Sequence, residues 1–311
     1  MAGMDTSCNK LTPVMALNLA APHTWPAAIM PTLVAVSAAA SVTAISASMS
    51  IVLLCIVILM QSAVNTFNDY YDYVKGTDSA EDNVDESDAV LVYNNIDPKS
   101  ALRLAVGFLG VAFVLGIYAI VMAGFVPLVI ALIGALFVVL YSAGKSPISY
   151  LPLGEVVSGV VMGGLIPLAV YKVLTGILDF RMLIVALPTI IGVALIMFTN
   201  NTCDLERDIP AGRKTLPILL GRERSRSLYH ALLALWVVLM IVNVAIWYTP
   251  GLVIVPFMLL ASYPIVKALW ANPLTPERRL QAMPQALTVN VVFGAFYAAA
   301  LLAASGVAVV L

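Results

Sequence analysis

Charge is scarce in this sequence. Lys, Arg, Asp and Glu make up 11% of the 311 residues, whereas a soluble domain carries about 25%. Hydrophobic residues account for 61% of the chain and form long runs, and a run of about 20 apolar residues spans a bilayer as a helix. This composition excludes a soluble globular protein and predicts one that crosses the membrane several times. The net charge of −1 gives no basis for nucleic-acid binding, and we expect none.

Cysteine is scarce as well. The three cysteines, Cys8, Cys55 and Cys203, lie far apart and form no Cys-x-x-Cys pair, which argues against a disulfide framework or a zinc site. The first 26 residues lack the apolar core and small-residue cleavage site of a secretory signal peptide. We therefore expect the first spanning helix to act as an uncleaved insertion signal, in a single membrane-embedded domain that covers residues 1–311.

The apolar residues fall into nine blocks, which predict an all-α bundle of nine transmembrane helices. Some connections are short turns with almost no charge, and three are long polar loops, at 69–100, 201–229 and 271–288. The nine blocks run over 27–46, 49–68, 101–122, 126–143, 153–173, 183–200, 230–248, 251–270 and 289–310.

The basic residues predict the orientation of the bundle. With nine spans and a cytoplasmic N-terminus, 14 of the 16 Lys and Arg residues lie on or near the cytoplasmic side, and only Lys172 and Arg181 lie outside, as the positive-inside rule requires. Of the 17 acidic residues, nine lie in 69–97 and five in 204–277. We therefore expect a protein of the cell membrane with its chemistry at the cytoplasmic face and its C-terminus outside.

The second apolar block ends in a polar motif over residues 65–78. If the helix continues through it, Asn68 and Asp72 lie one turn apart, Asn65 lies one turn earlier, and Asp69 shares a face with Asp72. An acid at the end of a membrane span is costly and usually functional. Because amide and carboxylate oxygens suit a hard cation, we expect Asn68, Asp69 and Asp72 to bind Mg²⁺.

The same Asn-x-x-x-Asp spacing returns 132 residues later, at the end of the sixth block. Asn200, Asp204 and Asp208 follow one another at intervals of four residues, so one helix would place them on a single stripe, with Asn201 close to Asp204. One such motif alone could be a capping cluster, but two at equivalent positions indicate an internal repeat. We expect Asn200, Asp204 and Asp208 to be the second group of Mg²⁺ ligands.

Basic and aromatic residues near the two motifs are candidates to complete the site. Lys75 follows the first motif, and Arg213 and Lys214 follow the second, although the positive-inside rule alone would also place basic residues there. Mg²⁺ commonly combines one or two carboxylates with substrate phosphates. The sequence thus predicts a metal-bound diphosphate whose lipid tail lies among the helices. Tyr141 could stabilise a carbocation, although an interfacial aromatic belt is the alternative.

These motifs resemble those of the UbiA superfamily of intramembrane aromatic prenyltransferases. The first motif of that family reads Asn-Asp-x-x-Asp-x-x-x-Asp, of which residues 68–72 carry the first part, and its second carries Asp-x-x-x-Asp, as 204–208 do. The resemblance implies a bundle of nine transmembrane helices with cytoplasmic caps over the site. It also implies Mg²⁺ as cofactor, a polyprenyl diphosphate as donor and an aromatic acceptor, in a protein surrounded by membrane lipids.

The resemblance implies roles for individual residues. The metals and basic residues would stabilise the leaving diphosphate. The residues implied to be catalytic are Asp72, Asp204, Asp208 and Lys214. The residues implied to bind the substrates are Asn65, Lys75, Tyr141, Asn201 and Arg213.

Three stretches, 68–78, 141–155 and 200–221, are most similar to the branch of the family that prenylates and decarboxylates 1,4-dihydroxy-2-naphthoate in menaquinone biosynthesis. Two residues depart from the family pattern, because Ala21 and Ala89 stand where an arginine is usual. Other acceptors, such as 4-hydroxybenzoate, a chlorin or haem, or a glycerol-phosphate lipid, are therefore alternatives. A secondary transporter is another, although its polar groups would lie near the bilayer midplane.

Overall fold

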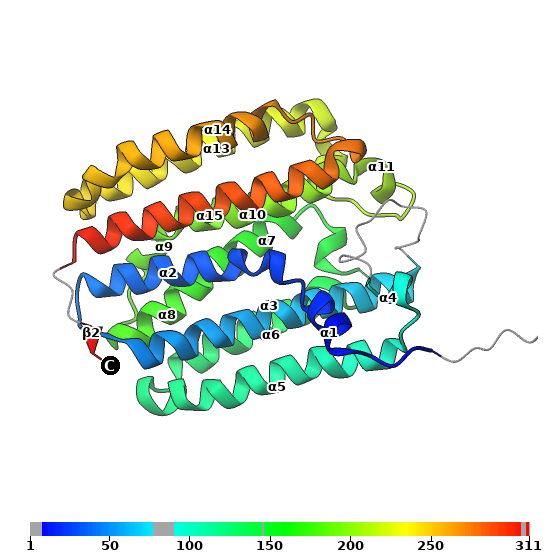
Figure 1. Ribbon diagram of the computed structural model, residues 1–311, viewed down its shortest axis with the longest axis horizontal. Helices are drawn as coiled ribbons and strands as arrows, with labels where there is room; N and C mark the ends of the chain where they lie inside the picture. Colours follow the sequence, from blue (N-terminus) through cyan, green and yellow to red (C-terminus); the bar gives the residue numbers. More distant parts are fainter. Residues whose placement is uncertain (1–7, 77–89, 145, 306–308, 311) are drawn as a thin grey trace, which may run out of the picture.

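The computed structural model describes residues 8–76, 90–144, 146–305 and 309–310. Its helices run side by side along the long axis of the molecule (Figure 1). The short helices α1 (Pro13–Ala20), α4 (Val90–Asn94) and α11 (Leu205–Asp208) lie at one end, which we call the polar end. At the opposite end, β2 (Val309–Val310) pairs in parallel with β1 (Ile45–Ser46). The two termini of the described chain thus lie at opposite ends, as an odd number of crossings requires.

Six helical segments of the described chain are long and apolar enough to cross a membrane, and three shorter apolar helices lie among them. All nine predicted blocks are thus largely helical. The long segments are α3 (Ala47–Lys75), α5 (Pro98–Ala123), α7 (Gly154–Ser158) with the π-helical η3 (Gly159–Leu165) and α8 (Ile166–Thr175), α13 (Arg222–Trp247), η4 (Thr249–Ile254) with α14 (Val255–Ala271), and η5 (Pro276–Arg278) with α15 (Arg279–Ala303). The shorter ones are α2 (Pro26–Ala40), α6 (Val126–Ser142) and α10 (Leu187–Cys203).

Three helices extend beyond their apolar blocks at the polar end. α3 continues to Lys75, so the condition under which Asn65, Asn68 and Asp72 share one face is met, and the predicted loop at 69–100 was wrong for 69–75. α13 begins at Arg222 and α15 at Arg279, inside stretches that were predicted to be loops, and those predictions were wrong for these turns. Charged side chains lower the hydropathy of these extra turns, which is why the sequence predicted loops there. In the structure Arg222 pairs with the exposed Glu206, and Arg279 pairs with the buried Asp204.

The remaining short elements connect the long helices. They are η1 (Pro22–Thr24), η2 (Ile148–Tyr150), α9 (Arg181–Val185) and α12 (Leu216–Leu220). η1 leads from α1 into α2, η2 lies between α6 and α7, and α12 lies between α11 and α13, after the second polar motif. These turns place several site residues described below.

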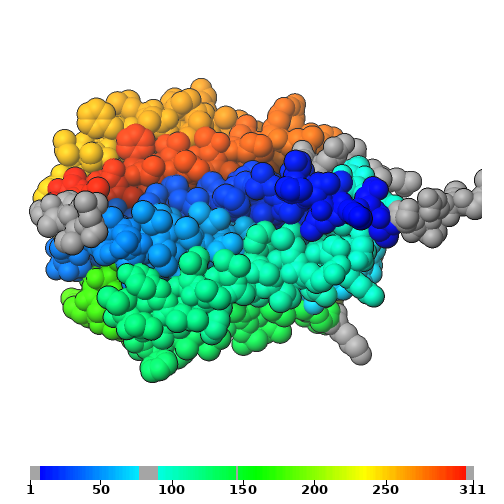
Figure 2. All heavy atoms as spheres, turned by 60° about the horizontal axis from the view of Figure 1, so that its bottom comes forward, coloured from blue at the N-terminus to red at the C-terminus, as the bar shows by residue number. Residues whose placement is uncertain are grey.

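The outer surface of the bundle is apolar. Figure 2 shows α5 along one outer face, and the exposed fractions of its side chains reach 64% at Val114, 75% at Val121 and 65% at Met122. An apolar surface of this kind is an aggregation hazard in water, whereas lipid tails cover it without penalty. The burial pattern therefore agrees with a bundle that is embedded in the bilayer.

Glycines allow η3 and α10 to pack with their backbones in contact. An added Cβ at Gly163 would lie 2.5 Å from the Cα of Ile190 on α10. At the same place the Oγ1 of Thr189 donates a hydrogen bond to the backbone oxygen of Gly163 at 2.6 Å. This contact holds η3 against α10, the helix that carries Asn200 of the second polar motif.

Replacing Gly163 with alanine should therefore destabilise the bundle. We expect overpacking of about 1–3 kcal/mol, measured as a lower unfolding temperature in detergent. Gly107→Ala is the matched control, because its Cβ would meet nothing within 4 Å and alanine favours the helix. Equal unfolding temperatures for the two variants would contradict the close packing of η3 on α10.

Candidate active site

A cavity of about 770 Å³ extends into the bundle at the polar end. Its walls come from the α1–α2 connection, α3, α6, η3, α10 and α15. Apolar side chains such as Phe137, Met162 and Met283 line the part that lies among the helices. Charged and amide side chains line the part near the helix ends, and they include Asn68 and Asp72 of the first motif and Asn200 of the second.

The first motif forms as predicted around Asn68 and Asp72. The Nδ2 of Asn68 donates to Oδ2 of Asp72 at 3.0 Å, one turn away on α3. Ser142, at the end of α6, donates from Oγ to Oδ1 of Asn68 at 3.1 Å. Asp72 is 6% exposed, and its other carboxylate oxygen, Oδ1, lies 3.3 Å from Nη2 of Arg213. A buried carboxylate at the end of a span is thus neutralised by a cation from a distant part of the chain.

Asp69 borders the cavity but is engaged differently from its predicted partners. Its Oδ2 accepts from the backbone N–H of Val90 at 2.8 Å, and its Oδ1 accepts from that of Leu91 at 3.3 Å. Val90 and Leu91 are the first residues of α4, and a carboxylate stabilises the free N–H groups at a helix start. Asp69 therefore attaches α4 to α3, and this contact competes with its predicted role as a metal ligand.

The second motif does not form one helical stripe, contrary to the sequence prediction. α10 ends at Cys203, and Asp204 lies in the break before α11, with φ −91° and ψ 11°. Asp204 is 4% exposed. It is held by Arg207, at 3.1 Å, and by Nε of Arg279, at 3.0 Å. Asn200 joins this group because its Oδ1 accepts from Nη2 of Arg279 at 2.9 Å.

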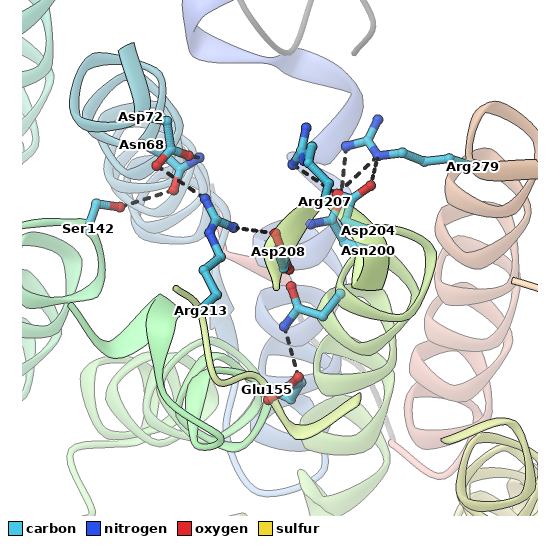
Figure 3. A network of polar contacts seen from close by, with 11 residues as sticks. Asn68, Asp72, Ser142, Glu155, Asn200, Asp204, Arg207, Asp208, Arg213 and Arg279 are labelled. Carbon is cyan, nitrogen blue, oxygen red and sulfur yellow. Dashed lines mark hydrogen bonds and ion pairs between the residues drawn. The ribbon is translucent and has the colours of Figure 1, made fainter. Parts of the chain in front are cut away.

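The break turns Asp208 away from Asp204 and toward Arg213 (Figure 3). Oδ1 of Asp208 lies 3.5 Å from Nη1 of Arg213, and neither carboxylate oxygen accepts a hydrogen bond from the described residues. The side chain is 1% exposed. Burial raises the pKa of Asp208 to about 6, against the opposing effect of Arg213. Arg213 thus lies between Asp72 and Asp208 and joins the two motifs through one guanidinium.

Arg207 and Arg279 were not singled out from the sequence as site residues. Both line the cavity, as Arg213 does. From the sequence, Arg279 was assigned to a polar loop. Apolar residues at 280, 283 and 287 have helical spacing, and this spacing could have predicted that the helix begins near Arg279. Three guanidinium groups beside three buried carboxylates form a site that is suited to exchanging a carboxylate partner for phosphate oxygens.

The other predicted basic residues lie outside the cavity lining. The Nζ of Lys75 donates to the backbone oxygen of Ser142 at 2.9 Å and lies 4.9 Å from the ring centre of Tyr150. Lys214 is exposed, and its backbone N–H donates to the backbone oxygen of Tyr150 at 2.8 Å. The structure therefore brings Arg213 into the site but not the side chain of its neighbour Lys214.

Three predicted substrate-binding residues have different positions. Tyr141 and Asn65 line the cavity. Asn201 faces away from it and donates from Nδ2 to Oε1 of Glu155 at 2.8 Å. Glu155 is 2% exposed, and no signal in the sequence indicated that it would pair with Asn201. The pair links α7 to α10 beneath the second motif.

Ala21 and Ala89 stand where the family usually has an arginine, and the structure describes only Ala21. Ala21 lines the cavity, as does His23 two residues later. Ala89 and the acidic stretch 78–88 lie outside the described residues.

The oxygen ligands at the polar end suit a Mg²⁺ site that is completed by water and substrate phosphates. In the described part of the chain, no three His, Cys, Asp or Glu side chains are close enough to hold a metal ion by themselves. Mg²⁺ does not require such a cage, because it usually takes one or two carboxylates and completes its octahedron with water and substrate phosphates. The Asn68–Asp72 pair and the unbonded oxygens of Asp208 are ligands of the required type.

The chain belongs to the UbiA prenyltransferase family, whose model matches residues 28–283. It is similar to the 1,4-dihydroxy-2-naphthoate octaprenyltransferase of Bacillus subtilis, with 31% identity over 89% of this chain and 88% of that protein. The Mycobacterium tuberculosis enzyme of the same name is 30% identical over 84% of this chain and 89% of that protein. Among solved structures, a UbiA homologue from Archaeoglobus fulgidus bound to GPP and Mg²⁺ shares the fold, with a TM-score of 0.61, 18% identity and coverage of 92% and 99% of the two chains.

Replacing Arg213 with glutamine should destabilise the protein. Asp72 and Asp208 would lose their shared cation while remaining buried, and removal of one partner from a buried ion pair costs about 3–5 kcal/mol. We expect a clearly lower unfolding temperature in detergent with chelator present. Arg224→Gln, at an exposed position of α13, is the control and should unfold like the wild type. An Arg213→Gln protein as stable as this control would contradict the bridging role.

Proposed function

We propose that this protein transfers a polyprenyl group from a polyprenyl diphosphate to 1,4-dihydroxy-2-naphthoate, with Mg²⁺ as cofactor and loss of carbon dioxide, to give demethylmenaquinone. One observation carries the proposal: Asn68 and Asp72 from the first motif and Asn200 from the second line the polar end of a cavity that is otherwise largely apolar. Asp204 lies behind this lining and shares Arg279 with Asn200. Such a cavity suits a substrate with an anionic head and a long hydrocarbon tail.

The relatives support the proposed acceptor, the proposed prenyl donor and the proposed metal ion. The two bacterial relatives are named for the acceptor 1,4-dihydroxy-2-naphthoate and for octaprenyl transfer. The archaeal homologue of the same fold was solved with GPP and Mg²⁺. A different aromatic acceptor, such as 4-hydroxybenzoate, is the alternative within the same reaction class.

Residues of the two motifs would hold the donor head group. Asn68 and Asp72 on α3, with Asn200, Asp204 and Asp208 from the α10–α11 region, would bind Mg²⁺, which neutralises the diphosphate as it leaves. Arg213, Arg207 and Arg279 would then exchange carboxylate oxygens for phosphate oxygens, which they can contact with two parallel hydrogen bonds. In this scheme Arg213 takes the role that the sequence suggested for Lys214.

The remaining chemistry takes place on the apolar side of these groups. The allylic C–O bond of the donor breaks, diphosphate leaves, and a ring carbon of the acceptor forms the new C–C bond. Because that ring carbon carries the carboxylate, carbon dioxide leaves in place of a proton and its bonding electrons restore the aromatic ring. Apolar walls such as Phe137 and Met162 exclude the water that would capture the allylic cation, and Tyr141 offers it an aromatic face.

The assay that tests the reaction combines detergent-purified protein, Mg²⁺, a labelled allylic diphosphate and 1,4-dihydroxy-2-naphthoate. We expect a prenylated, decarboxylated product by mass, which chelator abolishes. Product from 4-hydroxybenzoate but not from 1,4-dihydroxy-2-naphthoate would show that the proposed acceptor is wrong. Turnover that persists with chelator would exclude the role of Mg²⁺.

Asp72→Asn and Asp204→Asn should each lower kcat by at least about 100-fold, because each removes a carboxylate that would hold the Mg²⁺ needed to stabilise the leaving diphosphate. Steady-state turnover with saturating substrates measures the effect. Glu223→Gln is the control, since Glu223 is an exposed acid at the same end of the bundle and should leave kcat unchanged. Turnover at the wild-type level in either aspartate variant would refute the assigned metal site.

We further propose nine spans, with the N-terminus and the site at the cytoplasmic face and the C-terminus outside. Native cysteines provide the test, because Cys8 is exposed near the polar end and Cys203 is buried. Cys55 is exposed on the apolar part of α3, so Cys55→Ser serves as the background. A membrane-impermeant maleimide should label Cys8 in inverted vesicles but not in right-side-out vesicles. Labelling of Cys8 in right-side-out vesicles would reverse the proposed orientation.

A further inference from the structure

A second polar group lines the cavity, deeper than the acidic motifs. It consists of Thr24, Gln61 and Asn65, which we call the amide wall. Gln61 and Asn65 lie on the face of α3 that also carries Asn68 and Asp72. Gln61 precedes Asn68 by seven residues, so it lies roughly 10 Å farther along the helix axis. The amide wall therefore lies beside the apolar part of the cavity, where the reacting ring of an acceptor would be.

The backbone fixes the orientation of Asn65. α1 ends at Ala20, and Ala21 adopts a left-handed conformation with φ 46°. The carbonyl oxygen of Ala20 accepts from Nδ2 of Asn65 at 2.9 Å and from Nε1 of Trp25 at 3.1 Å. A carbonyl can only accept, so the nitrogen of the Asn65 amide must face Ala20. The oxygen of that amide must then face the opposite way.

That orientation in turn fixes Gln61. Oδ1 of Asn65 lies 3.2 Å from the amide group of Gln61, and only the Nε2 end of that group can donate to it. Nε2 of Gln61 also donates to Oγ1 of Thr24 at 3.3 Å. Both side-chain amides are thus oriented by a chain of contacts that begins at an unambiguous backbone acceptor, which removes the usual uncertainty in amide orientation.

The donor hydrogens of the amide wall are all in use. Asn65 donates to Ala20 and to Oγ1 of Thr24, the latter at 2.8 Å. Gln61 donates to Thr24 and Asn65, and the hydroxyl of Thr24 donates to the backbone oxygen of Ala21 at 2.9 Å. Among the described residues, Oε1 of Gln61 accepts no hydrogen bond. The wall therefore presents acceptors to the cavity and no donors.

We propose that Oε1 of Gln61 accepts a hydrogen bond from a hydroxyl group of the aromatic acceptor and so selects hydroxylated rings. This inference rests on the proposed function and adds a specificity residue to it. A wall that only accepts hydrogen bonds disfavours a carboxylate or a phosphate, which carry no proton at neutral pH. The carboxylate of the acceptor must then point away from Gln61, and the arginines at the polar end are the available cations.

For 1,4-dihydroxy-2-naphthoate the proposal identifies one hydroxyl. The 1-hydroxyl lies beside the ring carboxylate and is engaged by it, whereas the 4-hydroxyl, across the ring, is free to donate. The 4-hydroxyl is therefore the group that Gln61 binds. This arrangement directs the ring carbon that carries the carboxylate toward the polar end, where the allylic carbon of the donor lies next to its diphosphate.

Binding measurements test the inference separately from catalysis. The dissociation constants of 1,4-dihydroxy-2-naphthoate and of 1-hydroxy-2-naphthoate, which lacks the 4-hydroxyl, are measured by calorimetry under anaerobic conditions. We expect the wild type to bind the dihydroxy compound about tenfold more tightly, because its hydrogen bond to a buried acceptor is lost in the analogue. Gln61→Met, which removes the acceptor at similar volume, should reduce this preference to within about twofold.

Two further variants control for the loss of the acceptor oxygen and for the substitution to methionine. Gln61→Glu should retain the preference at a pH where its carboxyl group is protonated, because the O–H then donates to Oδ1 of Asn65 and the other oxygen is left to accept from the ligand. Gln281→Met, the same substitution as Gln61→Met at an exposed position of α15, should retain it as well. An unchanged preference in Gln61→Met, or its loss in Gln61→Glu, would overturn the inference.

The prenylation assay distinguishes the two possible failures. Prenylated naphthoate together with an unchanged preference in Gln61→Met would refute the role of Gln61 and leave the proposed function intact. If 4-hydroxybenzoate is the acceptor instead, the same comparison of 4-hydroxybenzoate with benzoate applies. If the wild type binds neither hydroxylated acid more tightly than its analogue, the inference is wrong for this cavity.

Discussion

The neutralisation of buried carboxylates is the constraint on which the site depends. Asp72, Asp204 and Asp208 all lie out of water at the end of the bundle, where an uncompensated charge would be prohibitive. Arg213 meets this need for two of them at once, at 3.3 Å from Asp72 and 3.5 Å from Asp208. The α3 helix and the connection after α10 are thereby held at one fixed separation, and that separation defines the mouth of the cavity.

The same residues that satisfy this constraint make the cavity useful for chemistry. A guanidinium that is paired with a carboxylate can also pair with a phosphate of similar geometry. An incoming anion therefore finds buried cations already in place at the polar end. The amide wall lies below, with its donors bound within the wall and to backbone oxygens. From the polar end inward, the cavity thus changes from cationic to hydrogen-bond-accepting to apolar, an order that matches a ring held between a charged head and a hydrocarbon tail.

Periodicity in the sequence predicted the helices and the first motif, because spacing along one helix determines which side chains share a face. The Asn68–Asp72 hydrogen bond followed from a separation of four residues. Spacing could not reveal the break at Asp204, since the polar residues around it are compatible with a continuing helix. It also could not reveal which arginine meets which acid. Arg279 lies 75 residues from Asp204, and only the tertiary packing of α15 beside α10 brings them together.

The attachment of α4 to α3 through Asp69 changes how genetic variation in the first motif should be interpreted. Asp69 and Asp72 are near neighbours in one acidic motif, and a screen that scores only loss of function would group them. Their contacts differ, because Asp69 holds the start of α4 whereas Asp72 faces Arg213. A substitution at Asp69 would release α4 and also remove a carboxylate that borders the cavity, and a second-site suppressor that reattaches α4 could restore only the first of these. No change elsewhere in the fold would replace the charge of Asp72.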